Sequence, residues 1–448
     1  MKEEDSDSFI SRRRVLRTTG AASVVGLAGC TSNDEDGNEN EGGNENNSDD
    51  GGNEDDSGGN EDGNDEAQQV KVTGVWSGGE QEDFRAVADH VEDQANVAVQ
   101  YHPRTTDSLL TGTLMDYESG VAPADVVVMP SPARILSDAR NGHLEPIGDT
   151  WDAENFAVDP ERVTVDGEVY AAPFKMDLKP GFWYRKSFFD EHGLSEPGSY
   201  DEFLSLCDEI SGIEGVDAPI ASGNGTGWPL SDITEGFLMR QENGAEFQQG
   251  LIDGDASFTD DRARTAFEEI KELHDMGYFS ETRNFGVQYE YFWENTLPLY
   301  FMGSFTPAQE AVKDASDLGV FRLPGTDGVT SSVNWFTVPA YTENTEAAKS
   351  AVSEFVSADG QQVWAERGGF IASNTEVPDD AYQIEVMANL PDLANEVTVV
   401  PDLDDALGNP FQEEFWSQLK GLWSDPSTAI DSIVESLDSA HQESLSEE

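Results

Sequence analysis

The side chains that most often carry out chemistry in proteins are scarce or uninformative in this 448-residue chain. Its two cysteines, Cys30 and Cys207, are too few for a disulfide framework or a four-cysteine zinc site. The six histidines show no paired metal-ligand spacing, and no segment matches a phosphate loop, a nucleophile elbow or a cysteine–histidine arrangement. With 90 acidic residues, two carboxylates close in sequence are no sign of glycoside hydrolysis. We therefore predict no catalytic residue, no metal site and no cofactor, and we expect that the chain is not an enzyme.

Two motifs in residues 1–30 predict export and lipidation. Ser11–Arg17 (SRRRVLR) resembles the twin-arginine consensus, and a short, weakly apolar stretch follows it. Leu27–Cys30 (LAGC) resembles a lipobox, in which the cysteine becomes the lipidated first residue of the mature protein. We predict a twin-arginine lipoprotein signal and a lipid anchor at Cys30 on the outer face of the cytoplasmic membrane. The alternative is a frayed basic terminus with a chance cysteine.

Residues 31–66 contain only Asp, Glu, Asn, Gly, Ser and Thr, with 15 acids and no basic or apolar residue. Such a segment cannot offset the entropy of ordering by burying apolar surface, so we predict a disordered acidic linker. Because it starts directly after Cys30, we interpret it as a tether of roughly 30 to 36 Å, which charge repulsion extends further. A solvating tail without function is the alternative.

The rest of the chain is also strongly acidic. Of the formal charge of −65, −51 falls on residues 67–448, because residues 1–30 contribute +1 and residues 31–66 contribute −15. This balance argues against nucleic acid as a partner, since phosphate binding needs a basic face. At about 1 M salt the Debye length falls to roughly 3 Å, which screens the repulsion. Together with the low lysine content, 9 of 25 bases, the charge indicates a halophile.

The body begins with alternating strand and helix patterns. Strands are predicted at 70–76, 97–101 and 125–129, and helices at 81–93 and 107–118. Strands separated by helices of this length build parallel βαβ units, which predicts an α/β fold. No apolar run reaches the 18 residues of a transmembrane helix.

Later segments carry helix-start signals and apolar runs. Ser199–Glu202 is a capping box before a helix that places Cys207 in the core, and Thr259 precedes a helical run over 260–276. Further strands are expected at 297–303, 319–323 and 335–339, and further helices at 347–355, 361–367 and 410–423.

A characteristic block lies in the middle of the chain. It comprises Val163–Phe174 (VTVDGEVYAAPF), Phe182–Phe189 (FWYRKSFF) and the capped helix at Ser199. This block resembles family 1 extracellular solute-binding proteins, the binding subunits of sugar ABC importers. Leu299–Phe305 resembles the family's strand that ends in a Gly-x-Trp ligand turn, and Phe321–Gly325 resembles the strand that follows. The similarity spans nearly all of residues 70–448.

Three further segments narrow the resemblance to the α-glucoside-binding subgroup. They are 129–132 (MPSP), 226–232 (TGWPLSD) and 362–371 (QVWAERGGFI). Together with the acidic composition, they identify the chain as similar to such a protein from a halophilic archaeon.

The resemblance implies a two-lobed, periplasmic-binding-protein-like α/β fold of type II, with a disordered N-terminal tether. Its lobes are joined by three hinge crossovers and close around a ligand. We expect the crossovers near 175–177, 332–336 and 371–375. Lobe 1 is then predicted to comprise residues 67–175 and 335–372, and lobe 2 residues 176–334 and 373–448.

A pyranose has an apolar C–H face and a rim of hydroxyls, so a sugar site combines aromatic rings with carboxylates and other polar groups. The candidate residues lie at an expected strand end, at the crossovers, in glycine-rich loops and on a late helix: Trp76, Glu80, Asp177, Trp228, Asp232, Phe305, Trp335, Phe370 and Trp416. Asp177 matches an acidic position of sugar-binding relatives, Phe305 stands where the family usually has Trp, and Trp416 aligns loosely with a ligand-contacting aromatic.

Some of these candidates also have a purely structural alternative. Trp76 and Trp228 could be core residues, and Glu80 could cap the helix that follows it. Phe370 is flanked by glycines that would let the backbone approach a ligand. The tryptophans within apolar runs are expected to be core: Trp183, Trp364 and Trp423.

We predict a monomeric substrate-binding lipoprotein that captures an α-glucoside or related oligosaccharide and delivers it to an ABC permease with a cytoplasmic ATPase. One alternative is a binding protein for a monosaccharide, a glycerol phosphate or a polyamine; few bases are expected in the cleft, which disfavours the phosphate. A secreted glycosidase and a sensor or adhesion protein are further alternatives.

Overall fold

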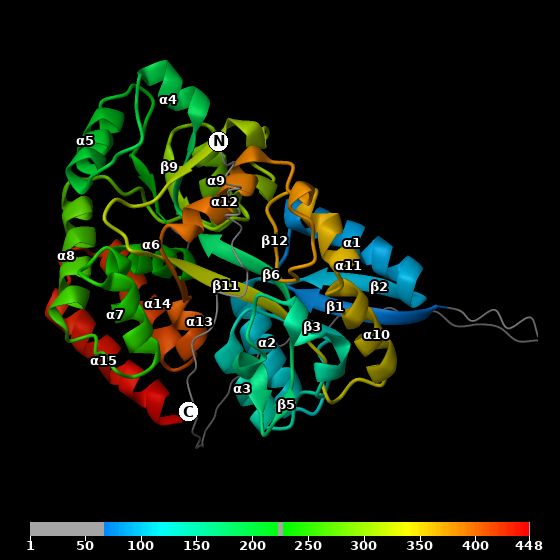
Figure 1. Cartoon of the computed structure of the whole chain (residues 1–448). Coiled ribbons are helices and arrows are strands. Elements are labelled where there is room, and N and C mark those ends of the chain that lie inside the picture. The colour runs from blue at the N-terminus through cyan, green and yellow to red at the C-terminus, as the bar shows by residue number, and fades with distance from the viewer. Residues whose placement is uncertain (1–66, 223–226, 448) are drawn as a thin grey trace, which may run out of the picture.

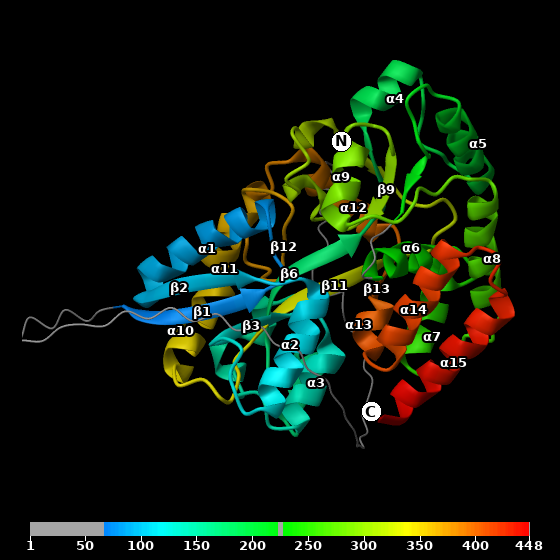
Figure 2. The same ribbon diagram turned by 180° about the vertical axis from the view of Figure 1, so that it is seen from behind.

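The computed structural model describes residues 67–222 and 227–447. The predicted signal, Cys30, the acidic linker and residues 223–226 before Trp228 lie outside the described residues. Within them, the strands form a seven-stranded, a four-stranded and a two-stranded sheet. The two larger sheets lie in different halves of the molecule (Figures 1 and 2). None of the described helices combines the length and apolar character needed to cross a membrane.

The first lobe contributes six strands of the seven-stranded sheet, in the order β12-β6-β11-β3-β1-β2, and the seventh strand, β13 of the second lobe, pairs with β11. Its elements are β1 (Gln68–Gly74), α1 (Gly79–Ala95), β2 (Val97–Pro103), α2 (Thr106–Glu118), β3 (Val126–Met129), α3 (Pro132–Arg140), β4 (Thr164–Val165), β5 (Glu168–Val169), β6 (Ala172–Lys179), β11 (Gly328–Thr337), α10 (Thr345–Phe355), α11 (Ala358–Ala365) and β12 (Ile371–Ala372). Strand β1 pairs in parallel with both β2 and β3, which confirms the predicted βαβ units.

Both faces of this sheet are covered by helices, and β3 shows how. Val126 and Val128 belong to the apolar cluster formed with α1, α10 and α11, whereas Val127 and Met129 belong to the cluster formed with α2 and α3. Because successive side chains of a strand point to opposite faces, a strand buried on both sides is apolar throughout. Burial on both sides therefore explains why β3, Val126–Met129, is apolar at every position.

The second lobe contains the four-stranded sheet, in the order β10-β7-β9-β8. Its elements are β7 (Gly181–Arg185), α4 (Lys186–His192), α5 (Tyr200–Ser211), β8 (Ile220–Ala221), α6 (Trp228–Met239), α7 (Gly244–Ile252), α8 (Asp261–Asp275), α9 (Phe285–Trp293), β9 (Leu299–Met302), β10 (Leu318–Phe321), α12 (Glu385–Asn395), β13 (Thr398–Pro401), α13 (Leu403–Leu407), α14 (Phe411–Ser424) and α15 (Ile430–Glu447). Aromatic residues of the sheet, Phe182, Phe301 and Phe321, share one core with the surrounding helices.

Three neighbouring strands lie where the chain passes between the lobes. β6 pairs with both β11 and β12, so that Asp177 faces Ser332 and Met176 faces Ile371. Figure 1 shows β6 and β11 side by side in the middle of the molecule. The register of this pair shifts between Asn334 and Trp335. The lobe limits expected near 175, 334 and 372 therefore fall within or at the ends of these strands; as lobe boundaries they remain a prediction.

Two predicted helix starts can be compared with the structure. The Ser199 hydroxyl accepts a hydrogen bond from the Glu202 amide, as the capping box predicts, but the Glu202 carboxylate accepts from the Gly198 amide rather than from Ser199. The cap of α8 is Asp260, not Thr259, because the Asp260 carboxylate accepts from the Arg262 amide. Cys207 on α5 is fully buried, as expected for a core residue.

Candidate functional site

A cavity of about 870 Å³ is lined by residues of both lobes, a volume within the range of roughly 300–1,000 Å³ that small-molecule sites occupy. The first lobe contributes the carboxyl ends of β1, β2 and β3, where α/β sheets bind ligands. The second lobe contributes α6, α9, α13, α14 and the segment after β9. Seven of the nine candidate residues line this cavity: Trp76, Glu80, Asp177, Trp228, Asp232, Phe305 and Trp416.

The remaining two candidates, Trp335 and Phe370, lie in the core and do not line the cavity. Trp335 follows Asn334, which lines the cavity from β11, so the alternation of the strand turns the tryptophan into the apolar cluster under α2 and α3. Phe370 stacks on Trp364 with ring centroids 5.2 Å apart.

The glycines beside Phe370 also have a structural role. A Cβ on Gly368 would lie 2.2 Å from Ile384 Cδ1, and one on Gly369 would lie 2.5 Å from Ala308 Cβ. Both have positive φ. They allow close packing between segments of the protein, and their role in admitting a ligand stays a prediction.

Two aromatic side chains of the second lobe form one wall of the cavity. The rings of Trp228 and Phe305 meet edge to face, with centroids 6.0 Å apart. Trp228 is the first residue of α6 and is half-buried, whereas Phe305 is 8% exposed. A glycine is required at position 227, directly before Trp228, because its φ is 115° and a Cβ there would lie 2.5 Å from Trp416 Cβ. An edge-to-face pair of this kind presents apolar surface to the cavity.

Trp76 is a core residue of the first lobe that also reaches the lining of the cavity. It is 1% exposed and packs against Phe84 and Trp364 in the core of the first lobe. Its Nε1 also donates a hydrogen bond to Asn334 Oδ1 over 2.9 Å, at the margin of the cavity. The Trp76 side chain therefore holds Asn334 in position from the core side of the cavity wall.

Glu80 does not cap α1. The cap position is Gly78, which has no side chain, and Glu80 lies in the first turn. Its Oε1 accepts a hydrogen bond from Lys175 Nζ over 2.8 Å. The interpretation as a helix cap is therefore wrong, and the carboxylate instead joins a buried ion pair.

Strand β6 presents three charged side chains to the cavity: Lys175, Asp177 and Lys179. They are two residues apart and thus share one face of the strand. Lys175 Nζ bonds to Glu80 and, over 3.2 Å, to Asp177 Oδ2. Lys179 Nζ bonds to both oxygens of Asp232, over 2.7 and 2.8 Å. Two buried ion pairs result: Lys175 with Glu80 of the first lobe, and Lys179 with Asp232 of the second lobe.

Burial and charge oppose each other in these pairs. Burial alone would lower the pKa of Lys175 and Lys179, but the surrounding carboxylates outweigh it and raise both. Burial raises the pKa of Glu80 although Lys175 opposes the shift. Burial raises the pKa of Asp232 to about 7. Lys179 opposes this shift, and the negative charge of Asp402 beside the same lysine adds to it.

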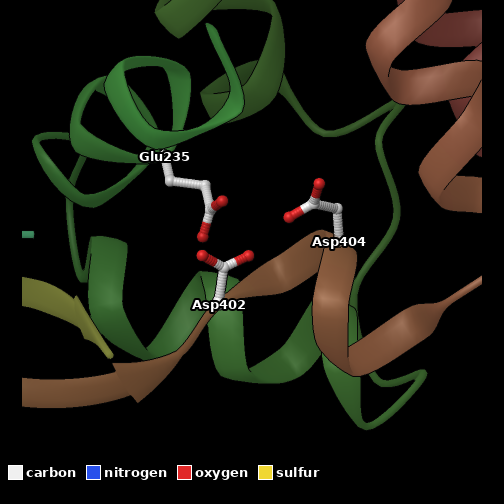
Figure 3. Close-up of side chains that lie close together, drawn as sticks. All are labelled: Glu235, Asp402 and Asp404. Atoms are coloured by element: carbon white, nitrogen blue, oxygen red, sulfur yellow. The ribbon is translucent and has the colours of Figure 1, made fainter. Parts of the chain in front are cut away.

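Three further acidic residues form the part of the site that could hold a metal ion. Glu235 of α6, Asp402 and Asp404 each place a carboxylate oxygen within 4.8 Å of the others (Figure 3). Burial raises the pKa of Glu235 and Asp404 well above the usual range, and neighbouring carboxylates add to the effect. The expectation of no metal-ligand cluster, which rested on histidine spacing, overlooked these carboxylates.

The sequence interpretation missed the lysines and the later acids of the site. Lys175, Asp177 and Lys179 form an i, i+2, i+4 series at an expected crossover, and this alternation could have revealed their shared face. Asp402 and Asp404 carry no comparable signal among 90 acids. Their proximity to Glu235 depends on the pairing of β13 with β11.

Comparison with known proteins gives the family. Residues 77–362 match the model of the bacterial extracellular solute-binding proteins. The chain is 36% identical to an uncharacterized ABC transporter extracellular-binding protein of Pyrococcus horikoshii, over 83% of this chain and 88% of that protein. It is 24% identical to an alpha-glucosides-binding periplasmic protein of Rhizobium meliloti, over 71% of this chain and 74% of that protein.

Solved structures confirm the two-lobed fold. A chitin oligosaccharide binding protein superposes with a TM-score of 0.73 at 18% identity, over 84% of this chain and 100% of that chain. The maltotriose binding protein of Thermus thermophilus superposes with a TM-score of 0.67 at 16% identity, again over 84% and 100%. The two sheets, the shared cavity and these similarities agree, and the chain belongs to the bacterial extracellular solute-binding protein family.

Proposed function

We propose that this protein captures an α-glucoside or a related oligosaccharide in the cavity between its lobes and delivers it to the permease of an ABC importer. The observation that carries the proposal is the cavity wall itself. The edge-to-face pair Trp228 and Phe305 offers apolar surface to a sugar ring, and the nearby carboxylates can accept hydrogen bonds from its hydroxyls. The relatives named as binding alpha-glucosides, chitin oligosaccharide and maltotriose support an oligosaccharide.

The site disfavours the alternative of an anionic solute such as a glycerol phosphate. Four basic residues line the cavity, more than the sequence led us to expect: Arg104, Lys175, Lys179 and Lys313. The two buried ones, Lys175 and Lys179, already bind carboxylates. A phosphate would have to displace Asp177 or Asp232 from them. A polyamine fits the acidic lining better and is the alternative worth testing, together with a monosaccharide.

The remaining parts of the function rest on the sequence. We infer export through the twin-arginine signal, lipid anchoring at Cys30, an acidic tether over residues 31–66 and adaptation to molar salt in a halophilic archaeon. In this arrangement the monomeric receptor stays on the outer face of the membrane beside its permease. It performs no chemistry on the sugar, which distinguishes it from a secreted glycosidase.

A ligand screen in molar KCl tests the proposal. Maltose, trehalose, sucrose and a longer maltodextrin are compared with glucose, glycerol phosphate and spermidine by thermal shift and calorimetry. A ligand at about 100 times its dissociation constant stabilises the folded state by roughly 2.7 kcal/mol. We expect saturable binding of a glucoside without release of glucose over time. Binding of spermidine alone, or turnover of a sugar, would contradict the proposal.

A further inference from the structure

A compact group of three carboxylates lies at the boundary of the cavity, apart from the aromatic wall. Glu235 comes from the second half of α6, Asp402 directly precedes α13, and Asp404 lies in the first turn of α13. Figure 3 shows their carboxyl groups directed at one another from these two elements. All three side chains are buried, with 0% of Glu235, 5% of Asp402 and 2% of Asp404 exposed.

Two oxygens of this group have no hydrogen-bond partner within the described part of the chain: Glu235 Oε1 and Asp402 Oδ1. The other oxygen of Glu235 is well satisfied, since Oε2 accepts from Gln248 Nε2 over 2.6 Å and from the Leu403 amide over 3.0 Å. These bonds fix the carboxylate and leave Oε1 without a partner among the described residues. A buried carboxylate oxygen without a partner costs free energy, so it points to a ligand.

The charge balance leads to the same conclusion. Two bases lie near this group, and neither is paired with Glu235 or Asp404. Lys179 Nζ bonds to both oxygens of Asp232 and lies 3.9 Å from Asp402 Oδ2. Burial lowers the pKa of Arg162, and the nearby Asp405 and Asp402 carboxylates oppose that shift. No ion pair to Glu235 or Asp404 occurs among residues 67–222 and 227–447. Three carboxyl groups this close cannot all ionise without a counter-charge, because the anions would repel one another strongly in a medium of low dielectric constant.

We propose that Glu235, Asp402 and Asp404 form a binding site for a hard divalent cation, and that Ca²⁺ is the ion that fits it. All the available donors are carboxylate oxygens, the ligands that Ca²⁺ and Mg²⁺ prefer. Ca²⁺ accepts irregular geometry and variable carboxylate binding, whereas Mg²⁺ demands a near-ideal octahedron. A divalent ion also neutralises more of this group's charge than K⁺ or Na⁺ does.

The ion has a route to the site. Asp402 and Asp404 line the cavity and Glu235 does not, so an ion that enters from the cavity meets the two aspartates first. Water fills its remaining coordination positions on the cavity side. The bound ion joins α6 to α13, and α6 carries the cavity residues Trp228 and Asp232. We therefore expect the cation to stabilise the second lobe's side of the cavity even without a sugar.

Terbium luminescence tests the site directly. Tb³⁺ replaces Ca²⁺ at oxygen sites and emits when a nearby tryptophan is excited, and the Trp416 indole donates a hydrogen bond to Asp404. The full chain is stripped with a chelator in molar KCl and titrated with Tb³⁺, then with Ca²⁺. We expect saturable emission that Ca²⁺ reverses, one Ca²⁺ per chain in calorimetry, and a higher thermal midpoint with Ca²⁺. A chain that shows no saturable binding of either ion overturns the proposal.

Matched variants locate the ion. Glu235→Gln and Asp402→Asn keep the side-chain shape and remove one charge, and each should weaken Tb³⁺ and Ca²⁺ binding at least tenfold. Asp83→Asn is the control, because Asp83 is a buried carboxylate paired with Arg367 outside this group. It should bind both ions as the parent does. Calcium affinity unchanged in both site variants, or lost equally in the control, would refute the assignment.

A second readout covers the case in which a site variant folds poorly. Trp416→Phe retains all three carboxylates, so calorimetry should still show one Ca²⁺ per chain while Tb³⁺ emission falls by more than half. Emission that stays at the parent level would place the ion elsewhere in the protein and overturn the assignment. None of these measurements includes a sugar, so their failure would leave the proposed transport function intact.

Discussion

Lys175 Nζ lies 2.8 Å from Glu80 Oε1 and joins the crossover strand β6 to the first turn of α1. The lysine side chain is 1% exposed and the glutamate side chain 14% exposed. The same ammonium group binds Asp177, whose other oxygen accepts from Ser304 of the second lobe. One lysine thus connects the first turn of α1 and the crossover strand, and through Asp177 also the segment after β9. The cavity between the lobes takes its shape partly from this network.

Lys175→Met should destabilise the protein strongly. The substitution leaves two buried carboxylates without their counter-charge, a change that costs about 3–5 kcal/mol. Thermal unfolding in molar KCl measures it. The control is Lys186→Met, whose ion pair with Glu385 is exposed and 3.7 Å long, and which should cost no more than about 1 kcal/mol. Equal stability of the two variants would show that the network contributes little.

Trp228→Ala should weaken sugar binding and leave the fold intact. The ring is half-buried at the cavity wall, and its loss removes apolar contact of roughly 1 to 3 kcal/mol. Calorimetry with the best ligand of the screen measures the change. Trp151→Ala removes another half-buried tryptophan, one that packs against Phe156 away from the cavity, and should keep the parent affinity. A collapse of thermal stability in Trp228→Ala would instead assign this residue to the core.

The early part of the fold was predictable from sequence because its signals are local. The strands and helices over residues 68–129 follow apolar periodicity, and both faces of the sheet are buried. The length of β11 was not predictable, because its segment Gly328–Asn334 contains Thr, Ser and Asn that pair with β6 and β13. Polar strands of this kind are stabilised by neighbours that only the folded chain supplies.

Some residues of the candidate site could likewise be identified from local sequence, and others could not. Aromatic residues after a strand or a glycine-rich loop, such as Trp76 and Trp228, could be identified because large apolar groups are unusual there. Trp335 and Phe370 are buried and do not line the cavity. Trp335 lies in a crossover strand whose alternate residues face the core, and Phe370 follows glycines that allow close packing within the protein. Lys179 and Asp402 depend on packing across long sequence separations. No local pattern predicts such contacts.

Low salt should unfold the protein. Residues 67–448 carry a net charge of −51, and at about 0.01 M salt the Debye length of roughly 30 Å leaves most of the repulsion unscreened. Near-ultraviolet circular dichroism should show loss of tertiary structure on dialysis and recovery in molar KCl. Molar concentrations of a neutral osmolyte serve as the control. A native spectrum at low ionic strength would contradict the repulsion argument.

Export and anchoring should depend on different residues. Replacing Arg12 and Arg13 with Lys should leave the precursor inside the cell, because the arginine pair is the recognised feature. Cys30→Ser should permit export but release the protein into the medium, since no acyl chain is attached. Cell fractionation distinguishes the two results. A Cys30→Ser protein that stays with the membrane would show that the lipobox interpretation is wrong.

His274 should make stability fall as the pH falls. Its ring packs between Phe279 and Trp423, and its Nε2 has no hydrogen-bond partner among the described residues. Burial lowers the pKa of His274 to about 4 from its usual 6.5. Between these values the unfolded chain binds a proton that the folded chain does not. The free energy of unfolding therefore decreases as the pH falls through this window, and the histidine's contribution is fully present only above about 6.5.

The histidine's effect can be separated from that of the many carboxylates by comparing variants. His274→Phe keeps an aromatic ring in the same place and cannot take up a proton. The parent should lose about 2 kcal/mol more stability than this variant between roughly pH 7 and pH 5, because one proton changes the free energy of unfolding by about 1.36 kcal/mol per pH unit over the roughly 1.5 units below 6.5. Urea midpoints in molar KCl measure the difference. His192→Phe on α4 is the control, because that histidine is exposed to solvent. Parallel pH profiles of the parent and His274→Phe would show that the buried ring is protonated at no cost to the fold.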